Sequence, residues 1–277
     1  MGPHFNNLLD TLSALKTQHG VTAVRGEFEA EGARPEELMW LARLGHLSGL
    51  KLCLKIGGPE AVSDLIMARS LGASSLIAPM VESAYGLQKA AKAYARIYPE
   101  TEWADVAFTF NIETRGAFEN LDEILDTAAR LPQVKGVVFG RVDFAGSMGL
   151  ARHDLDGAMV MDCVRTVASA CRDRQLDFAL GGGIAPDSVE MLQKMQGHYL
   201  SRYETRKIVY NPTVALSGDP AKGLELAARF ELDWLKLKRD HYQRLAQEDD
   251  ARITLLESRM TEAQDKPQAG TLSSSIA

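Results

Sequence analysis

The sequence has little cysteine and no long apolar run, and each shortage excludes a class of protein. Its three cysteines, Cys53, Cys163 and Cys171, lie in apolar stretches and form no C-x-x-C pair, so we expect buried free thiols in a reducing compartment and no zinc site. No apolar run approaches the roughly 18 residues that would cross a bilayer. The opening stretch, MGPHFNNLLD, lacks the basic start and apolar core of a secretory signal. These features predict a cytoplasmic protein without a membrane span.

An excess of positive charge is also absent. Lysine and arginine total 31 against 37 aspartates and glutamates, which gives a formal net charge of −6 and leaves no basic block to neutralise phosphates. We therefore expect no nucleic-acid partner. The chain of 277 residues is 45% hydrophobic and 25% charged, as in ordinary globular proteins, and its length suits one large domain or two small ones.

Short β-rich runs alternate with amphipathic stretches, a pattern typical of a parallel sheet covered by helices. After a first helix at residues 6–19, the expected strands are residues 21–29, 50–56, 75–80, 106–113, 136–140, 178–180 and 199–210. These seven strands are one short of a closed (β/α)8 barrel, and we expect the eighth to be a short piece near the N-terminus. A doubly wound sheet would need a glycine-rich dinucleotide turn after the first strand, and Gly26-Glu27-Phe28-Glu29 is not one. The predicted fold is an α/β TIM-type (β/α)8 barrel with a long C-terminal helical extension.

Residues 219–260 form the predicted helical extension. Apolar side chains recur in it among dense charges, at Leu224, Ala228, Leu232, Leu235, Leu245 and Leu255. A helix of about 60 Å cannot bury such a stripe on one barrel over its whole length, so we expect an arm at an oligomer interface. The alternative is a helix packed along its own barrel and broken near residues 247–250. The predicted domains are the barrel with its N-terminal helix at 1–218, the arm at 219–260 and a polar, disordered tail at 261–277.

Candidate functional groups follow from the predicted barrel, because the C-terminal ends of the strands and their loops form its mouth. The polar residues at these positions are Glu27, Glu29, Lys55, Glu82, Glu113, Asp143 and the run Thr205-Arg206-Lys207. Glu113 and Asp143 follow adjacent strands, and two carboxylates there can give oxygen ligands to an octahedral Mg²⁺ or Mn²⁺. The alternative is that both residues only cap the helices that follow.

Three linked motifs resemble one enzyme family. They are IAPMVE at residues 77–82, NIET at 111–114 with NLDEIL at 120–125, and GVVFGRVD at 136–143 closing on SMG at 147–149. Together, over residues 50–210, they resemble the HpcH/HpaI aldolase and citrate lyase β-subunit family. The resemblance implies a (β/α)8 barrel whose C-terminal helix is exchanged between subunits of a homo-oligomer, a trimer or hexamer. It also implies that Glu113 and Asp143 hold a divalent metal, Mg²⁺ or Mn²⁺, which chelates the carboxylate and keto oxygens of pyruvate or a related 2-oxo acid.

The sequence departs from this family where the chemistry needs a base and an electrophile. The family's aldolases carry Gly-Glu-His after an early strand, whereas this chain has Glu27, Phe28 and Glu29 and lacks the histidine. The arginine expected at the end of the next strand is Lys55, which keeps the charge but loses the bidentate fork. Glu27 or Glu29 is then the candidate base, and Lys55 is the group that neutralises the enolate.

A third departure places Arg141 beside Asp143, where the family has proline. We expect Arg141 to bind a second carboxylate or phosphate of the substrate; the alternative is an ion pair with a nearby acid. Two further alternatives concern catalysis: Lys55 forming a Schiff base with a keto group, and His153 acting as a substitute base.

The sequence therefore predicts a metal-dependent carbon–carbon lyase of the aldolase type, or a condensing enzyme running the same step in reverse, on a 2-oxo acid or related carboxylate. One alternative is a CoA-ester lyase like the citrate lyase β-subunit, although no basic patch is set aside for the CoA phosphates. Another is a barrel that has lost catalysis and serves as a 2-oxo-acid-binding or assembly subunit. The missing histidine favours loss of catalysis, and the retained pair of carboxylates disfavours it.

Overall fold

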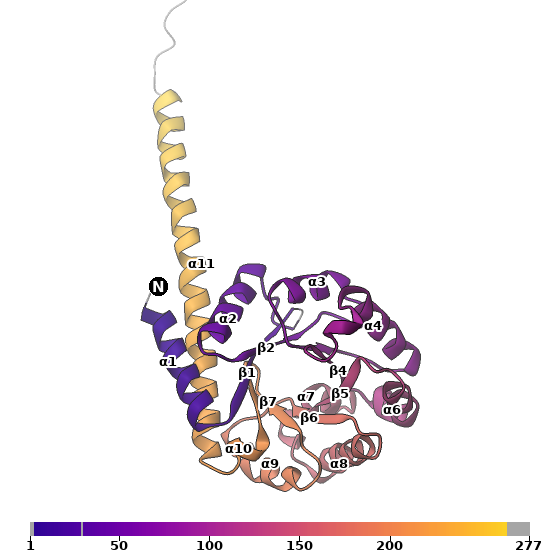
Figure 1. The fold of residues 1–277 in the computed structure, drawn as a ribbon. Helices are drawn as coiled ribbons and strands as arrows, with labels where there is room; N and C mark the ends of the chain where they lie inside the picture. Colours follow the sequence, from indigo (N-terminus) through magenta and orange to yellow (C-terminus); the bar gives the residue numbers. More distant parts are fainter. Residues whose placement is uncertain (1–2, 29, 265–277) are drawn as a thin grey trace, which may run out of the picture. The chain divides into compact units, whose positions relative to one another are not determined.

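The computed structural model describes residues 3–28 and 30–264, and in them eight strands close into a barrel in sequence order (Figure 1). The strands are β1 (Val21–Glu27), β2 (Lys51–Lys55), β3 (Ser75–Ala78), β4 (Ala107–Ile112), β5 (Val134–Gly140), β6 (Asp177–Gly181), β7 (Arg202–Glu204) and β8 (Ile208–Tyr210). The prediction of a closed eight-stranded α/β barrel followed by a long helix is confirmed.

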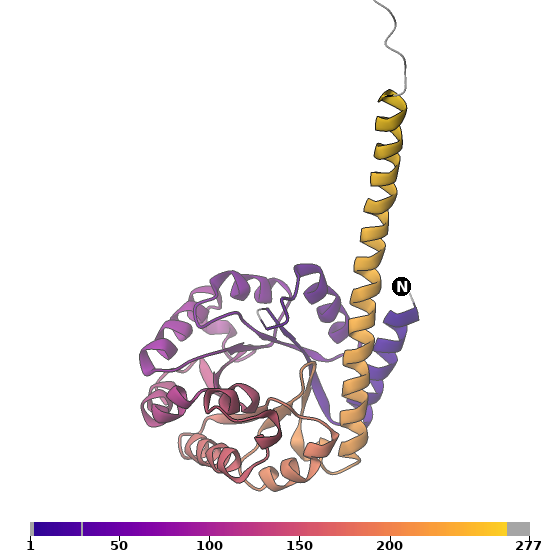
Figure 2. The same ribbon diagram turned by 180° about the vertical axis from the view of Figure 1, so that it is seen from behind.

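Helices cover the outside of the barrel, and Figure 2 shows α1 beside the first turns of α11. The α-helices are α1 (Pro3–Gln18), α2 (Pro35–Leu47), α3 (Val62–Ser70), α4 (Ala84–Ile97), α5 (Arg115–Glu119), α6 (Leu121–Ala129), α7 (Arg141–Ser147), α8 (Ala158–Asp173), α9 (Val189–Gln196), α10 (Pro212–Ala215) and α11 (Pro220–Gln264). Short 3₁₀ turns lie at η1 (Glu100–Glu102), η2 (Arg152–Asp154) and η3 (Pro186–Ser188).

The eighth strand does not lie near the N-terminus, where we expected it. The stretch 199–210, expected as one strand, turns back at residues 205–207, where the Thr205 amide donates to the Ile208 carbonyl at 2.9 Å. β8 therefore runs antiparallel to both neighbours, with Tyr210 opposite Tyr203 of β7 and Val21 of β1. The other neighbouring strands pair in parallel, so the barrel departs from strict (β/α)8 topology at this one strand.

Side chains that point into the barrel change from apolar to charged along the strands. One buried interior cluster consists of Ala23, Cys53, Ile77, Val138, Ala179 and Val209. Because side chains alternate between the two faces of a strand, the next inward positions are Arg25 and Glu27 on β1 and Lys55 on β2. The apolar cluster fills the barrel, and the charged positions lie toward its mouth.

The outer helices bury one apolar face each against the strands. In α8, Val160, Val164, Val167 and Cys171 follow one another at helical spacing and are all buried. The three cysteines are free thiols; Cys53 and Cys171 are buried, while Cys163 is half-buried. Within the described residues, no helix combines the length and the apolar character that crossing a membrane requires.

The long helix α11 continues through the point where the chain divides into two compact units, between Asp233 and Trp234. The division therefore lies inside the helix. The break near residues 247–250, which belonged to the alternative interpretation of this helix, is absent, because the helix is continuous there. Taken by itself, the second unit is a single helix whose side chains are exposed from Gln243 to Glu262. Residues 265–277 of the expected tail lie outside the described residues.

Candidate active site

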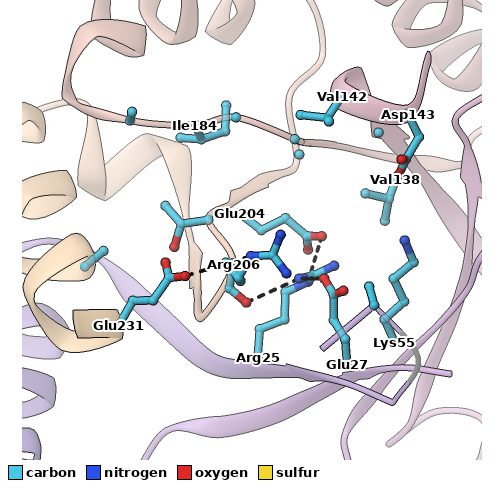
Figure 3. Close-up of a pocket in the computed structure, with 18 of the residues that line it drawn as sticks. Arg25, Glu27, Lys55, Val138, Val142, Asp143, Ile184, Glu204, Arg206 and Glu231 are labelled. Atoms are coloured by element: carbon cyan, nitrogen blue, oxygen red, sulfur yellow. Dashed lines mark hydrogen bonds and ion pairs between the residues drawn. The ribbon is translucent and has the colours of Figure 1, made fainter. Parts of the chain in front are cut away.

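The barrel mouth contains a cavity of about 440 Å³, lined by strand ends, by the loops that follow them and by the first turns of α11 (Figure 3). Its acidic side chains are Glu27, Glu113, Asp143, Glu204 and Glu231, and its cationic ones are Arg25, Lys55, Arg152 and Arg206. Glu27, Lys55, Glu113 and Asp143, which the sequence placed at separate strand ends, thus line one cavity. Figure 3 shows Glu27 and Lys55 reaching from β1 and β2 toward the segment that carries Asp143.

Glu113 follows β4 and is almost completely buried, at 1% exposure. Its Oε1 accepts a hydrogen bond from the Met80 amide at 3.0 Å, and its Oε2 accepts from Asn111 Nδ2 at 2.6 Å and Lys55 Nζ at 3.3 Å. Burial raises the pKa of this carboxyl group; Lys55 and the other two donors oppose the rise, and the charge of Asp143 adds to it. The net result is a pKa above the ordinary value.

Two backbone features fix the position of the Glu113 carboxylate. Met80 has a φ of 52°, in the left-handed region that a non-glycine residue rarely adopts, and this conformation accompanies the bond from its amide to Glu113. Gly140, at the end of β5, leaves the other side open. A Cβ atom at Gly140 would lie 2.7 Å from Glu113 Oε2 and 2.9 Å from Glu113 Cβ, so only glycine allows this approach.

Asp143 lies in the first turn of α7, is exposed, and has no hydrogen bond or ion pair within the described residues. It is close enough to Glu113 to raise the pKa of that group. Among the described residues, no cluster of three or more His, Cys, Asp or Glu side chains is arranged to hold a metal ion. Mg²⁺, however, commonly binds one or two carboxylates and keeps several waters. The interacting pair of Glu113 and Asp143 fits this donor requirement, and a cation there would offset their repulsion.

Lys55 and Glu27 lie in the cavity with opposite charges. The Lys55 side chain is 12% exposed, and its ammonium contacts Glu113. Glu27 forms an ion pair with Arg25. Burial acts to raise the pKa of Glu27, but the charges of Arg25 and then Lys55 outweigh it, so its pKa lies below the ordinary value and the group is a weaker base. Glu29, the other candidate base, lies outside the described residues.

Arg141 does not line the cavity, although we expected it to contact substrate. Its side chain is fully buried, Nε donates to the Gly182 carbonyl at 3.1 Å, and the guanidinium pairs with Asp156. An ion pair with a nearby acid was the alternative role predicted for Arg141, and Asp156 is that acid. Arg141 therefore ties α7, which carries Asp143, to the loop after β6 and to the segment that follows η2.

Two buried charges of the cavity, Arg25 and Glu204, were not among the site residues that the sequence predicted. Arg25 Nε lies 3.0 Å from Glu204 Oε1, and both side chains are less than 10% exposed. The available signal was strand alternation: Arg25 precedes Glu27 by two residues and therefore shares its face of β1. Glu204 was hidden because the turn that ends β7 was not recognised.

Two further predicted residues, Arg206 and His153, and one glycine run have defined places. Arg206 lines the cavity and lies 3.8 Å from Glu231 and 3.7 Å from Glu31. The glycine run 181–183 also lines it; a Cβ at Gly182, which has a φ of 81°, would lie 2.7 Å from the Arg141 amide nitrogen, so glycine is required for close packing. His153, considered as a substitute base, has a side chain 84% exposed and is not part of the cavity lining.

Comparisons with known proteins agree with this architecture. Residues 51–199 match the HpcH/HpaI aldolase/citrate lyase family. A solved HpcH/HpaI aldolase from Desulfitobacterium hafniense DCB-2 is 16% identical with a TM-score of 0.57, covering 72% of this chain and 81% of that one. A family protein from Burkholderia cenocepacia J2315 is 14% identical with a TM-score of 0.59, covering 87% and 90%. The citrate synthase SbnG is 16% identical with a TM-score of 0.56, covering 84% and 90%. The sequence matches no curated protein.

Proposed function

The chain belongs to the HpcH/HpaI aldolase/citrate lyase family, and from this membership we propose that it is a metal-dependent carbon–carbon lyase, or a condensing enzyme running the same step in reverse, that acts on a 2-oxo acid. The observation that carries the proposal is the grouping of Glu113, Asp143 and Lys55 in one cavity at the barrel mouth. Two carboxylates and an ammonium there suit a substrate that presents a carboxylate and a keto oxygen.

Glu113 and Asp143 would hold Mg²⁺ or Mn²⁺, with the remaining ligand positions left to water and substrate. The bound cation would polarise the keto oxygen and stabilise the negative charge that develops when a neighbouring carbon–carbon bond breaks. The three donors to Glu113 keep its carboxylate in one orientation, and Gly140 leaves space for it. Asp143 has no such restraint among the described residues, so its carboxylate can turn toward a ligand.

Lys55 supplies a positive charge in contact with Glu113, one member of the carboxylate pair. An ammonium has three N–H donors, and one of them meets Glu113 in the structure. The others are available to a substrate oxygen, so Lys55 is suited to neutralise an enolate.

Glu27 is the candidate base for the proton of the substrate hydroxyl. Its carboxylate faces the cavity and is ionised at neutral pH, but the nearby cations Arg25 and Lys55 lower its pKa. A base with a lowered pKa removes a proton less readily, so we expect slow turnover for this chain.

A second candidate function is a 2-oxo-acid-binding or assembly barrel without turnover. The observation that favours it is the lowered pKa of Glu27 in a chain that lacks the histidine of the family's aldolases. A CoA-ester lyase is the other enzymatic alternative, and its enolate would form next to the thioester carbonyl instead of on a 2-oxo acid.

Deuterium exchange tests the proposal without knowledge of the second substrate. The protein is incubated with pyruvate and Mn²⁺ or Mg²⁺ in D₂O, and loss of the methyl proton signal is followed by NMR. We expect metal-dependent exchange that EDTA abolishes and that Glu113→Gln or Asp143→Asn slows at least about 100-fold. Glu123→Gln, at an exposed position of α6, is the matched control and should exchange like the wild type. Exchange no faster than the metal-only blank would contradict pyruvate-enolate chemistry and leave the CoA-ester lyase and the binding barrel.

A further inference from the structure

Arg152 differs from the other cations of the cavity because it has no acidic partner. Arg25 pairs with Glu27 and Glu204, Lys55 with Glu113, and Arg206 with Glu231. Arg152 also lines the cavity and is exposed, yet within residues 3–28 and 30–264 it makes no hydrogen bond or ion pair. An arginine in a cavity otherwise composed of paired charges is available to an anion brought by a ligand.

The backbone that carries Arg152 is held on three sides. Asp154 caps the turn η2, because its Oδ2 accepts from the Ala151 amide at 2.9 Å. Leu155 is buried against Gly183, where a Cβ would lie 2.7 Å from Leu155 Cδ1. Asp156 pairs with the buried Arg141. The backbone at Arg152 is therefore fixed beside the cavity, while the residue itself is exposed.

We propose that Arg152 binds a second carboxylate of the substrate, at the end remote from the 2-oxo acid group. The inference rests on the proposed function, since Glu113, Asp143 and Lys55 take the 2-oxo acid end. Arg152 and Asp143 both follow β5 in the chain, and both line the cavity. A ligand held at Asp143 therefore lies in the cavity that Arg152 also lines. The substrate class is then a dicarboxylic 2-oxo acid, or the product of condensing a 2-oxo acid with a carboxylate-bearing partner.

The charges of the cavity favour a carboxylate over a phosphate at this position. Five acidic side chains face four cationic ones, and only Arg152 among the cations is unpaired in the described part of the chain. One guanidinium balances the single charge of a carboxylate with a bidentate pair of hydrogen bonds. A phosphate dianion would bring a further negative charge toward the carboxylates of the cavity.

Arg141 supports this arrangement without touching the ligand. Its guanidinium holds Asp156, four residues after Arg152, and its Nε holds the Gly182 carbonyl. The cation that the sequence placed at the substrate is thus a positioning residue, and the cation at the substrate is Arg152.

Matched pairs of ligands test the proposal. The full chain with Mg²⁺ is titrated calorimetrically with 2-oxopentanoate and 2-oxoglutarate, which differ in a terminal methyl or carboxylate, and with the six-carbon pair 2-oxohexanoate and 2-oxoadipate. We expect at least one dicarboxylate to bind about tenfold or more tightly than its monocarboxylate partner. Arg152→Gln should remove this preference and leave monocarboxylate binding unchanged, while Arg152→Lys should retain part of it. Arg96→Gln, at an exposed arginine of α4 outside the cavity lining, should bind like the wild type.

The remaining outcomes each overturn the proposal in a recognisable way. If the wild type binds both members of each pair equally, or if Arg152→Gln keeps the preference, Arg152 does not read a second carboxylate. If Arg152→Gln weakens monocarboxylates as much as dicarboxylates, the residue binds the 2-oxo acid end instead. If no 2-oxo acid binds the wild type, the proposed function fails and this inference fails with it.

Discussion

Glu27 and Glu113 are carboxyl groups of the same cavity whose pKa values are shifted in opposite directions. Glu113 is buried beside Asp143, which raises its pKa, whereas the charges of Arg25 and Lys55 lower that of Glu27. Sites that separate the pKa values of two acids in this way give them different roles. Here a cation would offset the charge repulsion that helps to raise the pKa of Glu113, whereas Glu27 stays ionised at neutral pH.

The lowered pKa of Glu27 makes a pH-dependent contribution to stability. Below its ordinary value of 4.5, the unfolded state takes up the proton more readily than the native state, so the contribution is present above that pH and is lost as the pH falls through the lowered native pKa. We expect Glu27→Gln to lower the free energy of unfolding by about 1–3 kcal/mol at pH 7, with a smaller difference from the wild type at pH 3.5. Urea denaturation at both pH values measures it; a constant difference would contradict the assignment.

Gly140 offers a direct test of the Glu113 position. In Gly140→Ala the new Cβ meets Glu113 Oε2 at 2.7 Å, so the carboxylate must move. We expect Mn²⁺ affinity, measured by calorimetry, to fall about 10- to 100-fold. Gly146→Ala on α7 is the matched control, because its Cβ meets nothing within 4 Å; it should keep the affinity and raise stability by roughly 0.5–1 kcal/mol. Equal affinities in both variants would count against Glu113 as a ligand.

At the scale of elements, the hairpin of β7 and β8 closes the barrel and joins it to α11. The rings of Tyr203 and Tyr210 stack with centroids 4.7 Å apart, and both side chains are buried. Only Tyr210 uses its hydroxyl, which donates to the Gly223 carbonyl of α11 at 2.9 Å. The Tyr203 hydroxyl is buried and has no hydrogen-bond partner in the described residues.

The two tyrosines give a matched pair of hydroxyl deletions. Tyr210→Phe should lower the free energy of unfolding by about 1 kcal/mol, since it removes the bond to α11. Tyr203→Phe should leave stability unchanged or raise it by a few tenths of a kcal/mol, because no bond is lost and a buried polar group is removed. Chemical denaturation of both variants measures the difference in the free energy of unfolding. Equal losses of stability would contradict a stabilising bond between the Tyr210 hydroxyl and the Gly223 carbonyl.

The parallel strands were predictable from sequence because each is a short apolar run between helical stretches. The hairpin was not, since residues 199–210 contain no Gly, Pro or Asn between the two strands and read as one run. The positions of Glu113 and Asp143 followed from strand ends alone. The sequence did not predict which arginine faces the cavity. Arg141 is buried and Arg152 is exposed because of side-chain packing, which the spacing of residues does not encode.

At the scale of the whole molecule, the part of α11 beyond Trp234 raises the question of assembly. Taken alone, it presents Ile253, Leu256 and Met260 at i, i+3 and i+7, each more than 40% exposed. A single helix in water gains no burial from such a stripe, so a partner surface is expected. The sequence predicts such a partner, because it places the arm at the interface of a homo-oligomer.

Substitutions on this helix test the proposed assembly. Leu256→Glu places a charge on the apolar stripe and should lower the mass measured by light scattering after size exclusion, while the melting temperature of the barrel changes by only a few degrees. Arg252→Glu, at another exposed position of the same helix, also introduces a glutamate and should leave the mass unchanged. A wild-type chain that is already monomeric at micromolar concentration would rule out the assembly.

The antiparallel strand also has a consequence for how the nascent chain folds on the ribosome. β1 is the first strand to be synthesised, but one of its two neighbours, β8, lies at residues 208–210. The pairing of Val21 with Tyr210 therefore waits until nearly the whole barrel has emerged. β8 follows β7 through a three-residue turn, and so short a loop costs little entropy to close. The hairpin is then completed locally and brought to β1 as a unit.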